Sequence, residues 1–314
     1  MNYALISGWH VHTQGFLNRV PEANCLYVWD TDHTRGKNLA DQYASQFQPD
    51  LTTILADEKV EAVVIEAATM SHYDLVVAAA EAGKHIFIDK PFTIDEKAAL
   101  ELKAVIAKAG VKFVISLETL VWGGYRQAKK MIDDGVLGEV SSIYFRRTHT
   151  GALADWLPAY WYDQNQTGGG VTLDLGCHGL NILPYFLGEP ESIHCSKTQM
   201  ANKGIDDNST TVMTFANGAI GTAHTSFVAD APANFLEILG SKGYLQVSGA
   251  EDNQQLKLHS TTFAGKEACF SNFTNEPYPI EVFQDAVMNN RPVPAEYGID
   301  AAVRLSRIIE ACYR

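Results

Sequence analysis

The feature that most restricts the fold is a regular alternation of strand-like and helix-like segments from the N-terminus to about residue 118. Short apolar runs typical of buried strands lie at residues 3–7, 26–30, 62–67, 85–88 and 111–116. The clearest helical patterns between them, 73–82 and 95–109, each end directly before a glycine. Strands that alternate with helices build right-handed βαβ units around a parallel sheet. The sequence therefore predicts a doubly wound α/β domain over residues 1–118, with ligands bound at the carboxyl ends of its strands.

The turn after the first strand carries part of a dinucleotide-binding fingerprint. Gly8 permits a tight turn, but His10 and Thr13 stand where the second and third glycines would be. Asp30 lies 22 positions after Gly8, near the spacing of about 20 expected for a carboxylate that bonds the adenosine ribose. An acidic residue there would repel a 2′-phosphate, so NAD is expected, whereas the nearby Arg35 leaves NADP open. Asp30 could also be a simple turn residue.

Past residue 118 the pattern changes to successive strands joined by hairpin signals. Strand-like runs lie at residues 140–148, 192–199, 210–215, 219–227, 235–239 and 244–247. Asn217-Gly218 and Ser241-Lys242-Gly243 are typical hairpin turns between neighbouring runs. Helical patterns are found at 124–134, 279–288 and 298–313. Residues 119–314 are therefore predicted to form an α+β domain with an open, mostly antiparallel sheet.

A polar stripe follows three successive glycines, Gly168 to Gly170. A helix predicted from this point towards Gly188 would place Asp174, His178 and Asn181 on one face, at positions i, i+4 and i+7. Three interpretations of the stripe remain open. It could be a buried structural network, or a metal site for which no third ligand is clustered nearby. It could also be a general base whose tautomer is fixed by a neighbouring carboxylate.

Two spaced motifs make the sequence resemble the family of glucose–fructose oxidoreductase, inositol 2-dehydrogenase and the MocA proteins. Thr69 and His72 lie in a turn before Gly83-Lys84-His85, which leads to Asp89-Lys90-Pro91. The triple glycine is followed by Asp174, Gly176 and His178 in the register of the family's second motif. Asp89 stands where the family usually has glutamate. The resemblance covers essentially the whole chain.

The resemblance implies a Rossmann domain and a dehydrogenase that uses NAD, or NADP, to oxidise a sugar, a cyclic polyol or a related hydroxy compound. It implies that Lys90 hydrogen-bonds the substrate hydroxyl, that Asp174 binds substrate and supports the base, and that His178 is the general base. It also implies a cis peptide bond between Lys90 and Pro91. Lys90 could otherwise be a surface lysine in a turn before proline.

The expected contacts of cofactor and substrate follow from the glycine turn and the resemblance together. The residues expected to bind the cofactor are Gly8, His10, Val11, Asp30, Thr69, His72, Asp89 and Lys90. Those expected to contact the substrate are Lys90, Trp161, Asp174, His178 and Asn181. Trp161 could stack on a sugar, although aromatic residues at such spacing also build cores. No metal is expected.

The alternative function is a sugar-sensing regulatory protein that binds nucleotide without turnover, because this fold also hosts such a regulator. The incomplete glycine turn favours the sensor. The combination of Lys90, Asp174 and His178 favours catalysis, since a sensor does not need a general base.

The net charge and the composition restrict the classes of partner that are expected for this chain. The formal net charge of −13 argues against binding to nucleic acids or anionic membranes, which would be repelled at long range. No apolar stretch is long enough for a membrane span or a signal peptide, so a cytoplasmic protein is expected. The five cysteines are scattered and contain no C-x-x-C pair, which is typical neither of a disulfide framework nor of a zinc site. The resemblance implies a homodimer or homotetramer formed through the C-terminal sheet.

Overall fold

The computed structural model describes residues 1–230 and 233–314, which divide into two compact units. Unit 1 contains residues 1–117 and 277–307, and unit 2 contains residues 118–276 and 308–314. Residues 277–307 thus pack with unit 1, although the division at residue 118 would have placed them with the second domain. That division stays a prediction for the domains that carry function.

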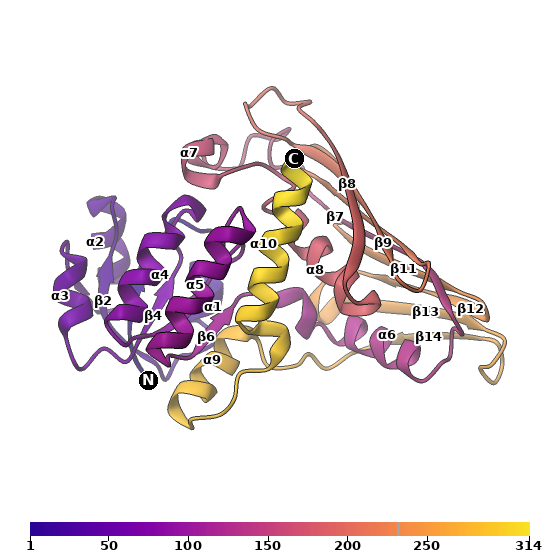
Figure 1. The fold of residues 1–314 in the computed structure, drawn as a ribbon, viewed down its shortest axis with the longest axis horizontal. Coiled ribbons are helices and arrows are strands. Elements are labelled where there is room, and N and C mark those ends of the chain that lie inside the picture. The colour runs from indigo at the N-terminus through magenta and orange to yellow at the C-terminus, as the bar shows by residue number, and fades with distance from the viewer. Residues whose placement is uncertain (231–232) are drawn as a thin grey trace. The chain divides into compact units, whose positions relative to one another are not determined.

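Unit 1 is built on a six-stranded sheet with the strand order β3-β2-β1-β4-β5-β6. Figure 1 labels β2, β4 and β6 of this sheet. All its strand pairs are parallel, which confirms the predicted doubly wound sheet. The strands are β1 (Asn2–Ile6), β2 (Asn24–Trp29), β3 (Gln46–Phe47), β4 (Ala62–Ile65), β5 (His85–Ile88) and β6 (Phe113–Ile115). Every residue of β4 is buried, as expected for a central strand covered on both faces. The sequence pattern missed β3, whose two residues are too few to show a period.

Helices cover this sheet. They are α1 (Thr13–Leu17), α2 (His33–Gln42), α3 (Leu51–Ala56), α4 (His72–Glu81), α5 (Glu96–Ala109), α9 (Pro279–Met288) and the part of α10 (Ile299–Tyr313) up to residue 307. Of these, α4 and α5 end close to the glycines that the sequence signals indicated. α5 is capped at its start by the Asp95 side chain, which accepts from the amide of Ala98. It ends at Gly110, whose φ of 66° is in the left-handed region. Phe283 of α9 packs against Phe87 of β5, with ring centroids 5.9 Å apart.

Unit 2 is built on an eight-stranded sheet with the order β14-β13-β12-β11-β7-β10-β9-β8. Only β7 and β10 pair in parallel among the strands described, so the predicted open, mostly antiparallel sheet is confirmed. The strands are β7 (Val140–Thr148), β8 (Pro190–Thr198), β9 (Asn208–Phe215), β10 (Ile220–Ser226), β11 (Asn234–Gly240), β12 (Gly243–Ser248), β13 (Gln255–Ser260) and β14 (Glu267–Ser271). The expected turn at Gly218 is present, with φ of 81°. β13 and β14 at the sheet edge were not predicted.

One face of this sheet is covered by α6 (Gly123–Asp133) and α8 (Gly176–Leu187). Gly179 of α8 lies against Phe145 of β7, so closely that an added Cβ would be 2.8 Å from that ring. Gly124 of α6 lies against Val247 of β12. α8 ends before Gly188 as predicted, but it begins at Gly176, so Asp174 lies in the turn that precedes the helix. The expectation of one continuous helical stripe from Asp174 is therefore wrong at its first residue.

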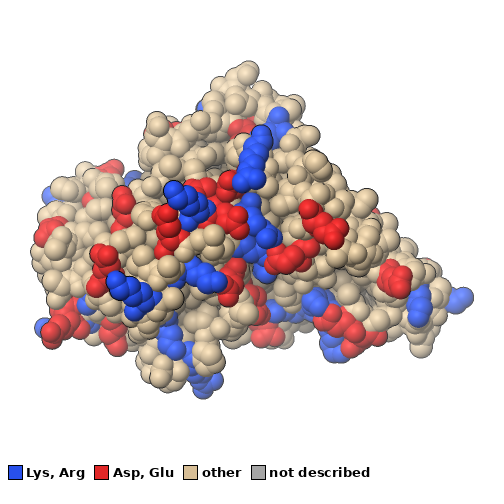
Figure 2. Space-filling model, viewed as in Figure 1, with Lys and Arg blue, Asp and Glu red and all other residues tan. Residues whose placement is uncertain are grey.

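Surface charge is mixed on the face that Figure 2 shows, where Lys and Arg side chains alternate with Asp and Glu. None of the helices in residues 1–230 and 233–314 has both the length and the apolar character needed to cross a membrane.

Candidate functional site

The glycine turn of unit 1 lies between β1 and α1, at the carboxyl ends of the central strands. A Cβ on Gly8 would stand 2.2 Å from a methyl carbon of Leu39 in α2, so a side chain here would displace that leucine. The Gly8 amide donates to a carboxylate oxygen of Asp30 over 3.0 Å. Val11, two residues before α1, is 54% exposed. The one fingerprint glycine that this turn keeps is therefore the one that helix packing requires.

Asp30, at the end of β2, is buried and receives an unusual number of hydrogen bonds. Its oxygens accept from the Ser7 hydroxyl at 3.0 Å, from the amides of Gly8 and Asp32, and from Arg35 twice, at 2.8 and 2.7 Å. A carboxylate offers about four lone-pair sites, so these five donors occupy it fully. Asp30 thus ties the glycine turn to the Arg35 guanidinium. Its predicted contact with the ribose stays a prediction, and a ribose hydroxyl would have to displace one of these donors.

Two histidines of the glycine turn converge on Asp89, the residue after β5. His10 Nδ1 lies 2.6 Å and His12 Nδ1 3.1 Å from the same Asp89 oxygen. The other oxygen accepts from the amide of Lys90 at 2.7 Å and from the Ser116 hydroxyl. Burial lowers the pKa of His10 to about 4, against the opposing effect of the Asp89 carboxylate. The turn is therefore joined to the strand end that carries Lys90.

The same three side chains bear on the question of a metal. The ligand atoms of His10, His12 and Asp89 lie within 4.8 Å of one another, a spacing that a metal ion could bridge. Among the described residues, Asp174 and His178 belong to no such group. The hydrogen bonds above already account for the positions of the three side chains. The expectation of no metal remains a prediction.

Glu66, directly after β4, is a buried acidic residue that the sequence reasoning missed. Its Oε2 lies 3.4 Å from the Thr13 hydroxyl, and its Oε1 has no hydrogen-bond partner in the part of the chain that the structure describes. Burial raises the pKa of Glu66 well above its usual range, and the charge of Asp89 acts in the same direction. A lone acidic residue inside the apolar run 62–67 was the signal that could have revealed it.

Glu66 makes stability depend on pH in a testable way. Because its pKa is raised on folding, the folded chain keeps a proton that the unfolded chain loses above about pH 4.5. Stability should therefore fall as pH rises, by at most about 1.4 kcal/mol per pH unit until the folded-state pKa is reached. Glu66→Gln removes this titration. We therefore expect the free energy of unfolding of the variant, relative to that of the wild type, to be higher at about pH 8 than at about pH 5 in urea unfolding.

The control for this prediction is Glu58→Gln, an exposed residue of the same unit. It should leave the pH dependence of unfolding unchanged. A Glu66→Gln variant whose stability relative to wild type is the same at both pH values would show that the carboxyl group titrates normally in the folded chain.

His72 positions the backbone around Lys90. One ring nitrogen lies 2.9 Å from the carbonyl oxygen of Pro91, and the other lies 3.0 Å from that of Ala67. The predicted cis peptide bond between Lys90 and Pro91 is present. Lys90 itself is 2% exposed, which excludes the simple surface lysine. Thr69, the other residue predicted in this turn, begins the 3-10 helix Thr69–Ser71 and is buried.

Unit 2 contains four of the predicted substrate residues, and two of them hydrogen-bond each other while a third contacts Thr119, which was not predicted. His178 is buried on α8, and its Nδ1 lies 3.5 Å from the hydroxyl of Thr119. The Trp161 indole donates to an Asp174 oxygen over 3.3 Å. Trp161 is only 3% exposed, and its predicted contact with the substrate stays a prediction. Neither amide atom of the buried Asn181 has a hydrogen-bond partner among the described residues.

The last of the three glycines, Gly170, is explained by Asp206, which the sequence reasoning also missed. Asp206 accepts from the amides of Gly170 and Thr172 at 3.0 and 2.8 Å, and from the Tyr313 hydroxyl at 2.9 Å. A Cβ on Gly170 would lie 2.0 Å from the backbone oxygen of Asp206. The turn that leads to Asp174 is thus packed too closely for any side chain at Gly170.

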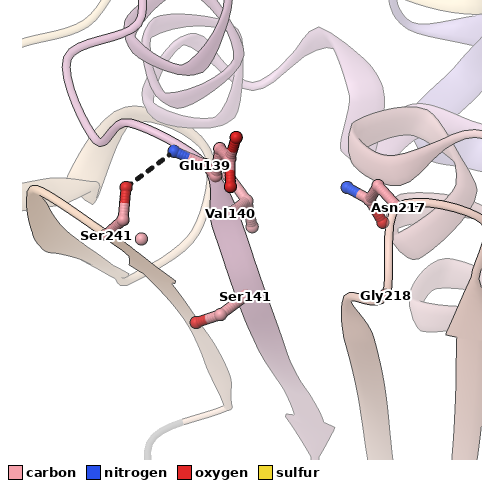
Figure 3. Close-up of a pocket in the computed structure, with 7 residues that line it drawn as sticks. Glu139, Val140, Ser141, Asn217, Gly218 and Ser241 are labelled. Atoms are coloured by element: carbon pink, nitrogen blue, oxygen red, sulfur yellow. Dashed lines mark hydrogen bonds between the residues drawn. The ribbon is translucent and has the colours of Figure 1, made fainter.

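A separate hollow in unit 2 contains none of the predicted site residues. It lies at the start of β7, beside the β9–β10 and β11–β12 turns, and is lined by Glu139, Val140, Ser141, Asn217, Gly218, Gly240 and Ser241. In Figure 3 the Ser241 hydroxyl points at the amide of Glu139, 3.0 Å away, while Asn217 faces them from the other side. Because these groups come from turns and include no cluster of titratable side chains, the hollow suggests no chemistry.

Comparison with known proteins gives the same order of two domains. A family model described as "Oxidoreductase family, NAD-binding Rossmann fold" matches residues 7–117. A second, described as "GFO/IDH/MocA C-terminal domain", matches residues 125–246.

Two curated relatives and one solved structure illustrate the similarity. The chain is 25% identical over 308 residues to scyllo-inositol 2-dehydrogenase (NAD(+)) of Bacillus subtilis (strain 168). The aligned residues cover 94% of this chain and 87% of that protein. It is 24% identical over 253 residues to 2,7-anhydro-N-acetylneuraminate hydratase of Escherichia coli (strain K12), which covers 79% and 67%. The crystal structure of GenD2 from gentamicin A biosynthesis in complex with NAD superposes with a TM-score of 0.83 at 21% identity, covering 100% and 93% of the two chains. At that identity the superposition shows a shared fold.

Proposed function

We propose a hydride-transfer reaction on a sugar, cyclic polyol or related hydroxy compound for this chain, because it belongs to the Gfo/Idh/MocA oxidoreductase family. As a member of that family it is an NAD-binding oxidoreductase. The oxidation of a CH–OH group is the finer part of the proposal. The observation that supports it most directly is Lys90, a buried lysine at the carboxyl end of β5 in the sheet that the NAD-binding model matches.

The chain's own groups have distinct parts in the proposed reaction. A bound nicotinamide supplies the hydride acceptor or donor. The Lys90 ammonium group donates a hydrogen bond to the substrate hydroxyl and stabilises negative charge that develops on its oxygen. His178 accepts the hydroxyl proton at a ring nitrogen, and the Thr119 hydroxyl orients its imidazole. Asp174, held by Trp161, binds a further hydroxyl of the substrate.

The proposed cofactor contacts fit the chemistry of unit 1 at most positions. We propose that Gly8, His10 and Val11 lie beside the pyrophosphate of the bound cofactor. We propose that Thr69, Asp89 and Lys90 line the part of the site that holds the nicotinamide. His72 contributes indirectly, since both its ring nitrogens face backbone carbonyl oxygens. The full pairing of Asp30 with Arg35 is the point of least fit for an adenosine ribose, and it leaves the choice between NAD and NADP to experiment.

The sensor alternative receives no support from the relatives described above, which are named as a dehydrogenase and a hydratase. The hydratase shows that a relative can have a net reaction other than oxidation. We propose the dehydrogenase because the scyllo-inositol enzyme is covered over more of its length. Pairing of two copies through the open face of the unit 2 sheet is also a proposal.

Titration with NADH and with NADPH, followed by nicotinamide fluorescence, tests the cofactor part first. A panel of sugars and polyols, read by nicotinamide absorbance, then tests the reaction. We expect saturable binding of NADH and turnover of at least one panel member. Binding with no turnover across the panel in either direction would favour the sensor, and binding of neither nucleotide would remove the proposed reaction.

A further inference from the structure

Two of the five cysteines meet on the face of β8 and β9 that the end of α10 contacts. Cys195 of β8 pairs in register with Thr211 of β9, and its sulfur lies 3.5 Å from the Ser209 hydroxyl. The Cys312 sulfur of α10 lies 3.6 Å from the Thr211 hydroxyl. Ser209 and Thr211 are two residues apart on one strand and so share a face. Both thiols therefore converge on one point of unit 2.

The surroundings of the pair make the two sulfurs chemically unequal. The Cys312, Ser209 and Thr211 hydrogen bonds lower the pKa of Cys195 to about 6 despite its partial burial, and the Lys197 ammonium group acts in the same direction. The hydrogen bond to Cys195 and burial both raise the pKa of Cys312. The pair thus consists of a partly accessible sulfur with a lowered pKa beside a buried thiol with a raised pKa. A nucleophile with a resolving neighbour is the arrangement of redox-active cysteines.

We propose that Cys195 and Cys312 are an oxidation site that hydrogen peroxide converts to a disulfide. The Cys195 thiolate attacks a peroxide oxygen, so an S–O bond forms, the O–O bond breaks and hydroxide leaves as water after taking a proton. Cys312 then loses its proton and attacks the sulfenic sulfur, so the S–S bond forms, the S–O bond breaks and a second water leaves. Two thiols are oxidised by two electrons in total, and one peroxide is reduced to two waters.

The consequence for the protein follows from the next residue. Tyr313 donates to Asp206 and accepts from the amide of Gly170, so it braces the turn that carries Asp174. A disulfide at Cys312 anchors Tyr313 to β8. Oxidation is therefore expected to stiffen this turn and to raise the melting temperature of the protein by several degrees.

Peroxide titration of the full-length chain tests the proposal. After quenching and denaturation, titratable thiols should fall from five to three, the intact mass should fall by two hydrogens, and one cross-linked peptide pair should contain Cys195 and Cys312. Dithiothreitol should restore all three readouts. Cys269→Ser removes an exposed cysteine as the matched control and should still lose two thiols.

Cys195→Ser and Cys312→Ser should each abolish the loss of mass and the cross-link. If either variant fails to fold, the peptide map of the oxidised wild-type chain still tests the proposal. Cys195 oxidised to sulfinic acid while Cys312 stays reduced would overturn the proposal. A cross-link through Cys269 to a second chain, with Cys195 and Cys312 both reduced, would do the same.

Discussion

Replacing His178 by glutamine is expected to lower kcat/KM by about 10²–10⁴-fold, the usual contribution of a general base. Glutamine approximates the size of imidazole and can hydrogen-bond Thr119, but it cannot take the substrate proton. The affinity for NADH, measured by fluorescence, should be unchanged. Steady-state kinetics with whichever substrate the panel identifies supplies the measurement. The pH dependence of kcat should also flatten, because the variant has lost the titrating group.

His194→Gln on β8 is the control for a histidine that the mechanism does not use, and its activity should match wild type. Thr119→Val is a second comparison: it removes the hydroxyl that contacts His178 and keeps the base, so its loss should be smaller than that of His178→Gln. Full activity in His178→Gln would end its assignment as the base.

Lys90→Met is expected to reduce kcat by about 10²–10³-fold, the usual effect of removing one donor to a developing oxyanion. Methionine keeps most of the side-chain length and none of the charge. Because the Asp89 carboxylate is still held by His10, His12 and Ser116, the strand end should keep its shape. NADH binding should weaken at most a few-fold. The measurement is kcat under saturating cofactor, with a parallel thermal melt.

Lys84→Met is a closely matched control, because Lys84 is a buried lysine at the opposite end of the same strand. Its ammonium group donates to the carbonyl oxygens of Asp57 and Val60, both at 2.8 Å. Loss of these bonds should lower the melting temperature and leave kcat nearly intact. If the two variants lost activity and stability in the same proportion, Lys90 would be a structural residue like Lys84.

The sequence predicted those features that depend on period and on local turn chemistry. The parallel sheet of unit 1 follows from alternating strands and helices, and the ends of α5 and α8 follow from Gly110 and Gly188. Lys90, Asp174 and His178 were predicted as site residues from two spaced motifs. Such motifs can be read from the sequence because the backbone after a strand or at a glycine turn depends mainly on neighbouring residues. Their roles stay predictions until the variants are measured.

Features that depend on partners distant in the chain were beyond this reasoning. Asp206 holds Gly170 across 36 residues, and nothing near either residue marks the pair. Asp30 has the spacing of a ribose ligand, yet its oxygens are occupied by Arg35 and by the glycine turn itself. Sequence spacing places a carboxylate at a strand end, but only the three-dimensional arrangement shows how many donors reach it.

The return of residues 277–307 to unit 1 has a consequence for how the protein is made. On the ribosome, all six strands of the parallel sheet emerge before residues 118–276 of unit 2, whereas Phe283 of α9 emerges only after those residues. During that interval Phe87 lacks its contact with Phe283, and Arg19 lacks its contact with the ring of Tyr278. A fragment cut at residue 117 would contain the whole strand-end cluster around Lys90 but expose the surface that α9 covers. A fragment that keeps the core of unit 1 would therefore need residues 277–307 as well as residues 1–117.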